Sequence, residues 1–435
     1  MSRITDEGIG IVLSSMPPIV ENILKNFCIK DLKRCGNVCK LWHNVSKVIA
    51  KQRHDIFRIF KIYEGRRCCV SSHSVHNSEQ SCYAQNKVDI GVHFYDVLKT
   101  ARSEPELVIL FGSNKIFKKP ENYFSNFTSY TNSEPICRKR KRKSKSAEES
   151  YIVSDRNHYN DSLTDFLESN LPRSCRIVSC AGLGIVGTPI YNVTPIEAEF
   201  APGLSALFLP MLPGIEIYQF SISKSHEKAL RKNDNVNSFV YELMGIPKDK
   251  HLGCLLIFFQ HNPDNLLTAK TIIEHYLTKQ DNQLAIGGAV VDKIAAPTKN
   301  GEEAYKLFTG LAFAGDNIQT ASIILDKDIN TEEKVLAKLT KLKNCNIPEN
   351  NCIAFMFACC GRGCGLYNKS NVEAEAFHKI FPNVPLFGLF GRGEIGNEYL
   401  PQNGKKVHSN FDKDDNWYHG YTTIFVLISL QTLVS

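Results

Sequence analysis

Cysteines, glycines and one arginine gather at the end of an apolar run in the stretch FMFACCGRGCGLYN, which spans Phe355–Asn368. These residue types are compatible with a metal site, a reactive-thiol active site or a structural glycine turn that ends a strand. A zinc site needs four ligands in short paired spacings. Cys360 and Cys364 have neither a second cysteine pair nor a spaced histidine couple nearby. We therefore expect no metal and no cofactor here.

A thiol enzyme would use Cys359 or Cys360 as its nucleophile, and it would need a base within hydrogen-bond reach. The motif contains no histidine, and the nearest one in sequence, His378, falls inside a predicted helix. A cysteine-dependent enzyme is therefore the weaker hypothesis.

A second glycine turn repeats the pattern in PLFGLFGRGEIG (385–396). Pockets of α/β sheets form at strand ends of this kind, so the two turns could line one cavity in which the two arginines hold an acidic group. Amide protons and Arg362 near Cys359 would favour an accessible thiolate. Two tight turns with solvated arginines fit the pattern equally well. The predicted pocket consists of Cys359, Cys360, Gly361, Arg362, Gly363, Gly391, Arg392, Gly393 and Glu394.

Strands and helices must position these turns, and from about residue 63 the two patterns alternate, which predicts a layered α/β body. The predicted strands are Leu107–Phe111, Cys254–Phe259, Ala285–Val291, Ala321–Leu325, Cys352–Ala358 and Pro385–Phe390. The predicted helices are Leu266–Leu277, Thr331–Leu342 and Val372–Phe381, the last opened by a Ser370–Glu373 capping box. GLGIVG (182–187) has dinucleotide-binding spacing, but Pro189 and Pro195 follow where that motif needs a helix. We expect a strand that ends in a glycine turn.

The N-terminal segment, Ile11–Ile62, has apolar residues at helical spacing. A unit of this size cannot bury so much apolar surface alone, so we expect a face that binds a partner. The segment resembles the F-box in Met16-Pro17, Ile23-Leu24, Asp31-Leu32 and Val38-Cys39 with Trp42. The resemblance implies binding to a Skp-type adaptor. The residues expected to contact it are Pro17, Ile23, Leu24, Leu32, Val38 and Trp42.

Composition excludes several classes of protein. The 435 residues allow two or three domains. Their 15 cysteines, without a secretory signal, favour reduced thiols, and no apolar segment reaches the ~20 residues of a membrane span. The net charge of +7 equals the seven basic residues within RKRKRKSK (138–145), so we expect no direct nucleic-acid contact. This run lies in a predicted flexible insertion, 115–161. As a nuclear-import signal it would consist of Arg138, Lys139, Arg140, Lys141, Arg142 and Lys143.

The glycine turns carry a second resemblance. FMFACCGRG, NVEAEAFHKIFPNVPLFGLFGRGEIG and HGYTTIFVLISL are similar to the C-terminal FIST domain, and weaker similarity covers the preceding half. The expected domains are an F-box (1–62), a FIST N-terminal-like region (63–265) and a FIST C-terminal domain (266–435).

Together the two resemblances imply a non-catalytic substrate-recognition subunit of an SCF-type ubiquitin ligase, nuclear and cytoplasmic. It would work with a cullin scaffold and a RING subunit, for polyubiquitination and proteasomal degradation of protein substrates. The alternative is a FIST module that senses a small molecule and so controls partner binding.

Overall fold

The computed structural model describes residues 10, 13, 15–62, 90–118, 167, 170–232, 236–295, 307–401 and 417–431. A small helical unit is followed by a body of three mixed sheets covered by helices, so the predicted α/β class is confirmed. Residues 115–118 of the predicted insertion belong to helix α6. Its remainder, including Arg138–Lys143, lies outside the described residues.

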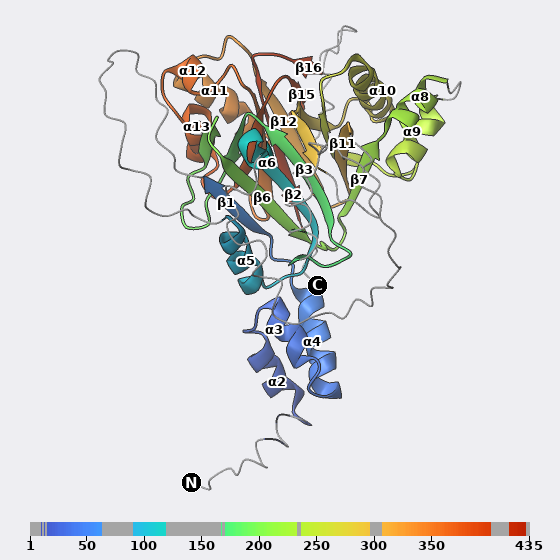
Figure 1. Cartoon of the computed structure of the whole chain (residues 1–435), viewed down its shortest axis with the longest axis vertical. Coiled ribbons are helices and arrows are strands. Elements are labelled where there is room, and N and C mark those ends of the chain that lie inside the picture. The colour runs from blue at the N-terminus through green and yellow to red at the C-terminus, as the bar shows by residue number, and fades with distance from the viewer. Residues whose placement is uncertain are drawn as a thin grey trace, which may run out of the picture.

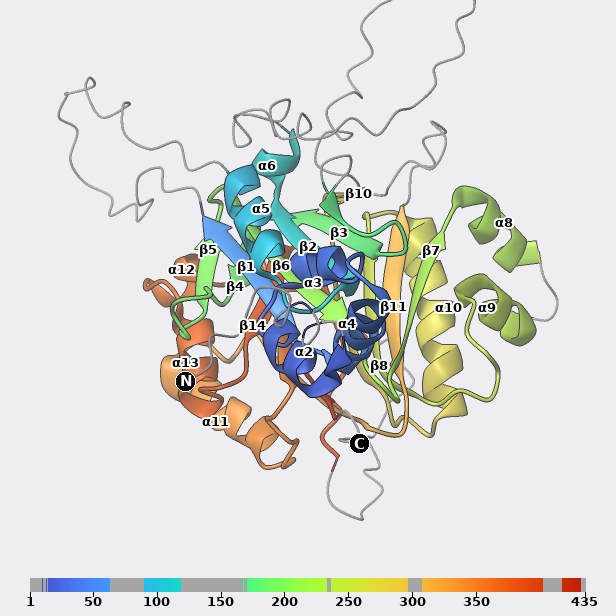
Figure 2. The same ribbon diagram turned by 90° about the horizontal axis from the view of Figure 1, so that it is seen from below.

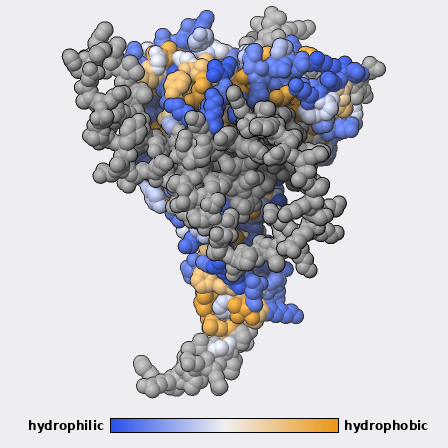
Figure 3. All heavy atoms as spheres, in the orientation of Figure 1, coloured by the Kyte–Doolittle hydropathy of each residue, from blue (hydrophilic) through white to orange (hydrophobic). Residues whose placement is uncertain are grey.

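Three helices form the N-terminal part, called the helical unit below: α2 (Pro17–Leu24), α3 (Ile29–Cys35) and α4 (Lys40–Gln52). Proline at the first turn of α2 costs little, because that amide has no helical partner. The helical unit extends from one end of the body (Figures 1 and 2), and apolar side chains show on its surface (Figure 3). The sequence interpretation extended it to Ile62, but Phe57–Ile62 is strand β1 of the body.

The first sheet has the strand order β1-β6-β2-β3-β10. Its further strands are β6 (Gly203–Pro210), β2 (Pro105–Ser113), β3 (Arg176–Gly182) and β10 (Lys293–Ala295). The second sheet has the order β16-β15-β9-β8-β11-β7. Its strands are β16 (Tyr418–His419), β15 (Glu394–Gly396), β9 (Ala285–Val290), β8 (Leu252–Phe259), β11 (Phe308–Ala314) and β7 (Glu216–Ile222).

The third sheet has the order β12-β17-β13-β14-β4-β5. Its strands are β12 (Ile318–Leu325), β17 (Thr423–Leu430), β13 (Cys352–Cys359), β14 (Leu386–Gly391), β4 (Gly184–Gly187) and β5 (Ile196–Glu199). Strands from both sides of the expected boundary at 265/266 therefore share a sheet. GLGIVG contains the last residue of β3 and the whole of β4, and the described residues 188–195 contain no helix, as the prolines after the motif predicted.

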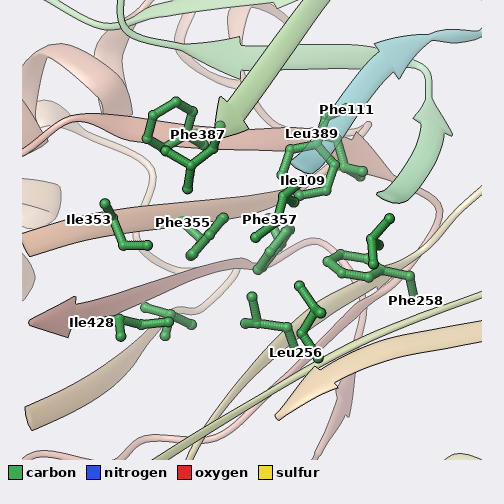
Figure 4. Packing of buried hydrophobic residues seen from close by; sticks show 14 of the residues in the cluster. Ile109, Phe111, Leu256, Phe258, Ile353, Phe355, Phe357, Phe387, Leu389 and Ile428 are labelled. Carbon is green, nitrogen blue, oxygen red and sulfur yellow. The ribbon is translucent and has the colours of Figure 1, made fainter. Parts of the chain in front are cut away.

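An aromatic core lies between the three sheets (Figure 4). Phe111 of β2, Phe258 of β8 and Phe357 of β13 meet edge to face, with ring centroids 5.4 to 6.0 Å apart. Each such pair is worth about 0.5–1.5 kcal/mol beyond the burial of its area. This cluster fixes how the strand ends of different sheets align.

Helices cover the outer faces of the sheets. The first sheet carries α5 (Ile90–Thr100) and α6 (Asn114–Lys118). The second carries α8 (Lys224–Lys232), α9 (Val236–Met244) and α10 (Pro263–Lys279). The third carries α11 (Glu332–Lys343) and α13 (Val372–Ile380), with α12 (Cys364–Tyr367) between β13 and α13. The predicted strands and helices of the body are thus all present.

The carboxyl ends of β2, β9, β13 and β14 meet at one place, called the distal edge below. Asn114 after β2 and Arg392 after β14 both bind the carboxylate of Asp292, which follows β9. The other end of β2 begins after Glu104, which pairs with Lys33 of the helical unit. The distal edge therefore faces away from the helical unit. In Figure 1 it lies at the top, near the labels β15 and α12.

Candidate functional site

The two glycine turns lie side by side at the distal edge. β13 and β14 pair in parallel with Cys359 opposite Gly391, and the amide of Cys360 donates to the carbonyl of Gly391 at 3.0 Å. Gly363 has φ +71°, and a Cβ there would lie 2.4 Å from the carboxylate of Glu199. Only glycine fits that combination of backbone and contact. The prediction that the two turns meet is confirmed.

Arg362 does not face a ligand, which corrects the expectation that it holds an acidic group. Its side chain is 1% exposed and pairs with the carboxylate of Glu373 at 2.7 Å. The other guanidinium N–H groups donate to the carbonyls of Asp326, Ile329 and Tyr421 and to the Tyr367 hydroxyl. All five N–H groups of an arginine are thereby used. Arg362 fastens the loops around the turn to one another.

The predicted Ser370–Glu373 capping box is wrong. The N-cap residue of α13 is Asn371, in left-handed backbone, and its side-chain oxygen accepts from the Glu197 amide at 2.8 Å. Glu373 is fully buried and turns to Arg362 instead. A capping box needs its glutamate at the exposed first turn, whereas here a buried cation binds that carboxylate.

Two glutamates of β5 take over the capping, and the sequence interpretation missed both. Glu197 accepts from the amide of Ala374 in α13 at 2.7 Å, and Glu199 accepts from the amide of Cys364 in α12 at 2.7 Å. Their spacing of two residues places both on one face of the strand. Burial and the Glu373 carboxylate raise the pKa of Glu197 to about 8. The alternation EAE before an apolar strand was the available signal.

The Cys359 thiol is not a stabilised thiolate, which corrects the second expectation for the turn. Its side chain is buried, and burial together with the Glu394 carboxyl raises the pKa of Cys359. Cys360, next to it, is half-buried. Glu394 is fully buried and accepts from the hydroxyl of Thr422 at 2.9 Å. Burial raises the pKa of Glu394 to about 8.

Arg392 is the accessible arginine of the two turns. Its side chain is 54% exposed and binds Asp292 at 2.7 Å. The predicted pocket residues therefore do lie together, but Arg362 and Glu394 are buried and bind other groups of the protein. The cavities of about 790, 560 and 330 Å³ are lined by other residues. Within the described residues the cysteines form no disulfide and His, Cys, Asp and Glu form no metal-binding group.

The predicted adaptor-binding residues divide into two groups. Leu24 and Leu32 are buried in the core of the helical unit, so their expected place on an exposed face is wrong. Pro17 and Val38 are exposed, and Ile23 and Trp42 are half-buried. The exposed apolar surface of the helical unit consists of Met16, Ile19, Val38 and Val48, at 47%, 39%, 65% and 52% exposure. Figure 3 shows apolar side chains gathered there.

None of the described helices combines the length and the apolar character that crossing a membrane requires.

Residues 13–49 match the F-box domain, and residues 309–397 match the FIST C domain. Both resemblances noted in the sequence are thereby confirmed.

The whole chain also has relatives. It is 30% identical over 426 residues to F-box only protein 22 of Pongo abelii and 29% identical to that of Homo sapiens, over 96% of this chain and 94% of each relative. Among solved structures, a cyanuric acid hydrolase from A. caulinodans has a TM-score of 0.27 at 10% identity, over 62% of this chain and 84% of that one. The helical unit, the FIST C match and the end-to-end identity place the chain in the F-box only protein 22 family.

Proposed function

We propose that this chain is the substrate-recognition subunit of an SCF-type cullin-RING ubiquitin ligase. The exposed apolar surface of the helical unit is the observation that carries the proposal. Four large apolar side chains lie open to solvent on a unit that matches the F-box, and such a patch favours a protein partner. The partner would be a Skp-type adaptor, which links the chain to the cullin and the RING subunit.

The arrangement of the chain suits a subunit that acts by proximity. The helical unit lies at one end of the body and the distal edge at the other. A protein substrate held on the body would be presented to the ubiquitin-loaded enzyme at a fixed distance, which converts a bimolecular step into an effectively unimolecular one. Polyubiquitination of the substrate and its degradation by the proteasome would follow.

A cysteine-dependent enzyme is less well supported, since the raised pKa of Cys359 leaves its thiol protonated at neutral pH. A small-molecule sensor is not favoured by the glycine turns either, since Arg362 already uses its donors within the protein.

Ile19→Asp combined with Val38→Asp is expected to abolish adaptor binding while the body stays folded. Each apolar side chain buried in an interface contributes about 1.5–3 kcal/mol, so the pair should weaken binding roughly 100-fold or more. Co-purification of the adaptor and the cullin with the full chain measures it. Met211→Asp is the matched control, because Met211 is an exposed apolar residue of the body, at 61%. Unchanged co-purification in the double variant would refute the ligase proposal.

Leu24→Asp is unsuitable for the same test. Leu24 is fully buried in the core of the helical unit, so a charge there would unfold the unit. Loss of the adaptor would then say nothing about the surface.

We further propose that the chain is both nuclear and cytoplasmic, with Arg138–Lys143 as the import signal. Clustered lysines and arginines are the usual form of such signals. Changing the six residues to serine should move a fluorescent fusion of the full chain towards the cytoplasm. Fluorescence microscopy measures the nuclear fraction, and an unchanged fraction would exclude this segment as the signal.

A further inference from the structure

Arg53 lies at the joint between the helical unit and the body, directly after α4. Its side chain is buried, and both terminal nitrogens of its guanidinium donate to backbone carbonyls. Three of these carbonyls belong to the end of α2 and the turn after it: Leu24 at 3.4 Å, Lys25 at 2.9 Å and Phe27 at 2.7 Å. The fourth belongs to Arg102 of the body, at 3.1 Å. One side chain therefore holds both parts of the molecule.

Two of the carbonyls bound by Arg53, those of Leu24 and Lys25, lie at the C-terminal end of α2. The last carbonyls of a helix have no partner within the helix and carry partial negative charge. A guanidinium offers several donors in one fixed plane and so binds several such carbonyls at once. Arg53 thereby fixes where α2 ends relative to the body, which a single point charge such as lysine could not do.

The body segment that receives the helical unit is residues 101–104, which connects α5 to the central strand β2. The carbonyl of Ala101 accepts from the amide of Ile29 at 2.8 Å, and Ala101 packs into the core of the helical unit. The buried hydroxyl of Ser103 accepts from the amide of Asp55 at 2.8 Å. The helical unit is thus attached to a strand in the middle of the first sheet.

The segment that follows Arg53 is tied to the body. Phe57 stacks on Phe208 of β6 with ring centroids 4.5 Å apart, and Nδ1 of His54 lies 2.8 Å from the carbonyl oxygen of Met211. Residues Asp55–Arg58 line a cavity of about 560 Å³ together with α5, and they also line a cavity of about 330 Å³ on the side of the third sheet. The pairing of Phe57 with Phe208 fixes the far end of this segment in the first sheet. The angle between the helical unit and the body is set by the contacts around Arg53 together with the attachment to residues 101–104 described above.

We propose that Arg53 is a positioning residue that locks the adaptor-binding helical unit at one orientation to the body. The proposal rests on the proposed ligase function: a fixed orientation sets where a bound substrate lies relative to the ubiquitin-loaded enzyme. Without Arg53 the helical unit would keep its apolar core, to which Ala101 of the body contributes, and would still bind the adaptor, but its orientation would vary. The effective concentration of the substrate lysine would then fall.

The test uses the full chain with a fluorophore pair introduced as noncanonical residues at Lys47 of α4 and Lys341 of α11, both exposed. Single-molecule energy transfer measures the distance distribution between the two labels. Arg53→Met should broaden it, and Arg53→Lys should broaden it less. Lys33→Met is the matched control, because it removes an exposed ion pair across the same joint, with Lys33 58% exposed, and should leave the distribution unchanged.

Adaptor co-purification separates the two hypotheses. Wild type that fails to bind the adaptor refutes the ligase function, whatever the distances show. Variants that bind the adaptor like wild type and transfer ubiquitin to a lysine reporter fused at the C-terminus roughly 3- to 10-fold more slowly support positioning. An unchanged distance distribution in Arg53→Met overturns the proposal. So does loss of adaptor binding in both Arg53 variants, because Arg53 would then serve folding rather than orientation.

Discussion

Arg362→Met is expected to lower the free energy of unfolding by about 3–5 kcal/mol, the cost of leaving a buried charge without its partner. Glu373, fully buried, would lose its cation at 2.7 Å. The Glu373 carboxylate raises the pKa of Glu197, so loss of the Arg362 guanidinium would leave two neighbouring carboxyl groups without a counter-charge. The carbonyls of Asp326, Ile329 and Tyr421 would each lose the hydrogen bond that Arg362 donates. Urea unfolding of the full chain, followed by tryptophan fluorescence and circular dichroism, measures the change.

The second glycine turn provides the control for this prediction. Arg392→Met removes an arginine from the equivalent position, but that arginine is 54% exposed and bound to Asp292 alone among the described acidic residues. We expect a loss below about 1 kcal/mol, as for other exposed ion pairs. Adding Glu373→Gln to Arg362→Met should recover part of the stability, because the unpaired charge is then absent. If the two arginine variants lose equally little, Arg362 is free to bind a ligand after all.

The strands of the body could be predicted because each is a short apolar run bounded by polar or glycine-rich segments. Residues buried on both faces leave such runs in the sequence, as in Cys352–Cys359. Strand β1 was missed for the opposite reason. FRIFKI is short and partly exposed, and its partner β6 lies far along the chain. Pairing over that distance leaves no local signal, so the segment was assigned to the helices before it.

The surface of the helical unit shows another limit. Helical spacing identifies apolar residues that share a face, but it does not say whether the same chain or a partner covers that face. Leu24 and Leu32 are covered by the other helices of the unit and by Ala101 of the body. Val38 follows the end of α3 and remains 65% exposed. Only the packing of the three helices against one another and against residues 101–104 separates the buried apolar residues from the exposed ones.

The glycine turns show the same limit for charged groups. The sequence predicted that both turns end parallel strands and meet, because strand ends of one sheet share an edge. It did not predict that one arginine is buried and the other exposed, since the two motifs are both GRG. The difference comes from Glu373, which α13 places under the first turn, and from Glu197 and Glu199, which come from a hairpin about 160 residues earlier.

Glu394→Gln is expected to remove much of the decline of stability between pH 4.5 and pH 8. Burial raises the pKa of Glu394 from 4.5 to about 8 in the folded chain. The folded state therefore binds the proton more tightly than the unfolded state. Its stabilising effect is complete below pH 4.5, and it is lost as the pH rises through about 8. At 1.36 kcal/mol for each pKa unit, the loss of stability amounts to about 3–5 kcal/mol.

Glutamine copies the protonated form of Glu394 at every pH. Its carbonyl oxygen can still accept from the Thr422 hydroxyl, and its amide would lie beside Cys359, as the carboxyl does. The variant should therefore match wild type near pH 4.5 and exceed it by several kcal/mol at pH 8. Urea unfolding measured at half-unit steps of pH tests this. Burial also raises the pKa of Glu197 to about 8. Glu197 therefore causes part of the decline of stability with rising pH in wild type and variant alike.

The control for the pH series is Glu216→Gln. The hydrogen bond from Lys250 lowers the pKa of Glu216, so its stabilising effect is present above the pKa of the unfolded chain and is lost as the pH falls through the lowered pKa of the folded chain. Removing Glu216 should thus lower stability by a similar amount throughout the series above about pH 4.5, and it should leave the decline towards pH 8 unchanged. If Glu394→Gln is less stable than wild type at pH 8, or if its decline equals that of wild type, then Glu394 is ionised in the folded chain. The carboxylate would in that case be available as a base beside Cys359, and the thiol-enzyme hypothesis would regain support.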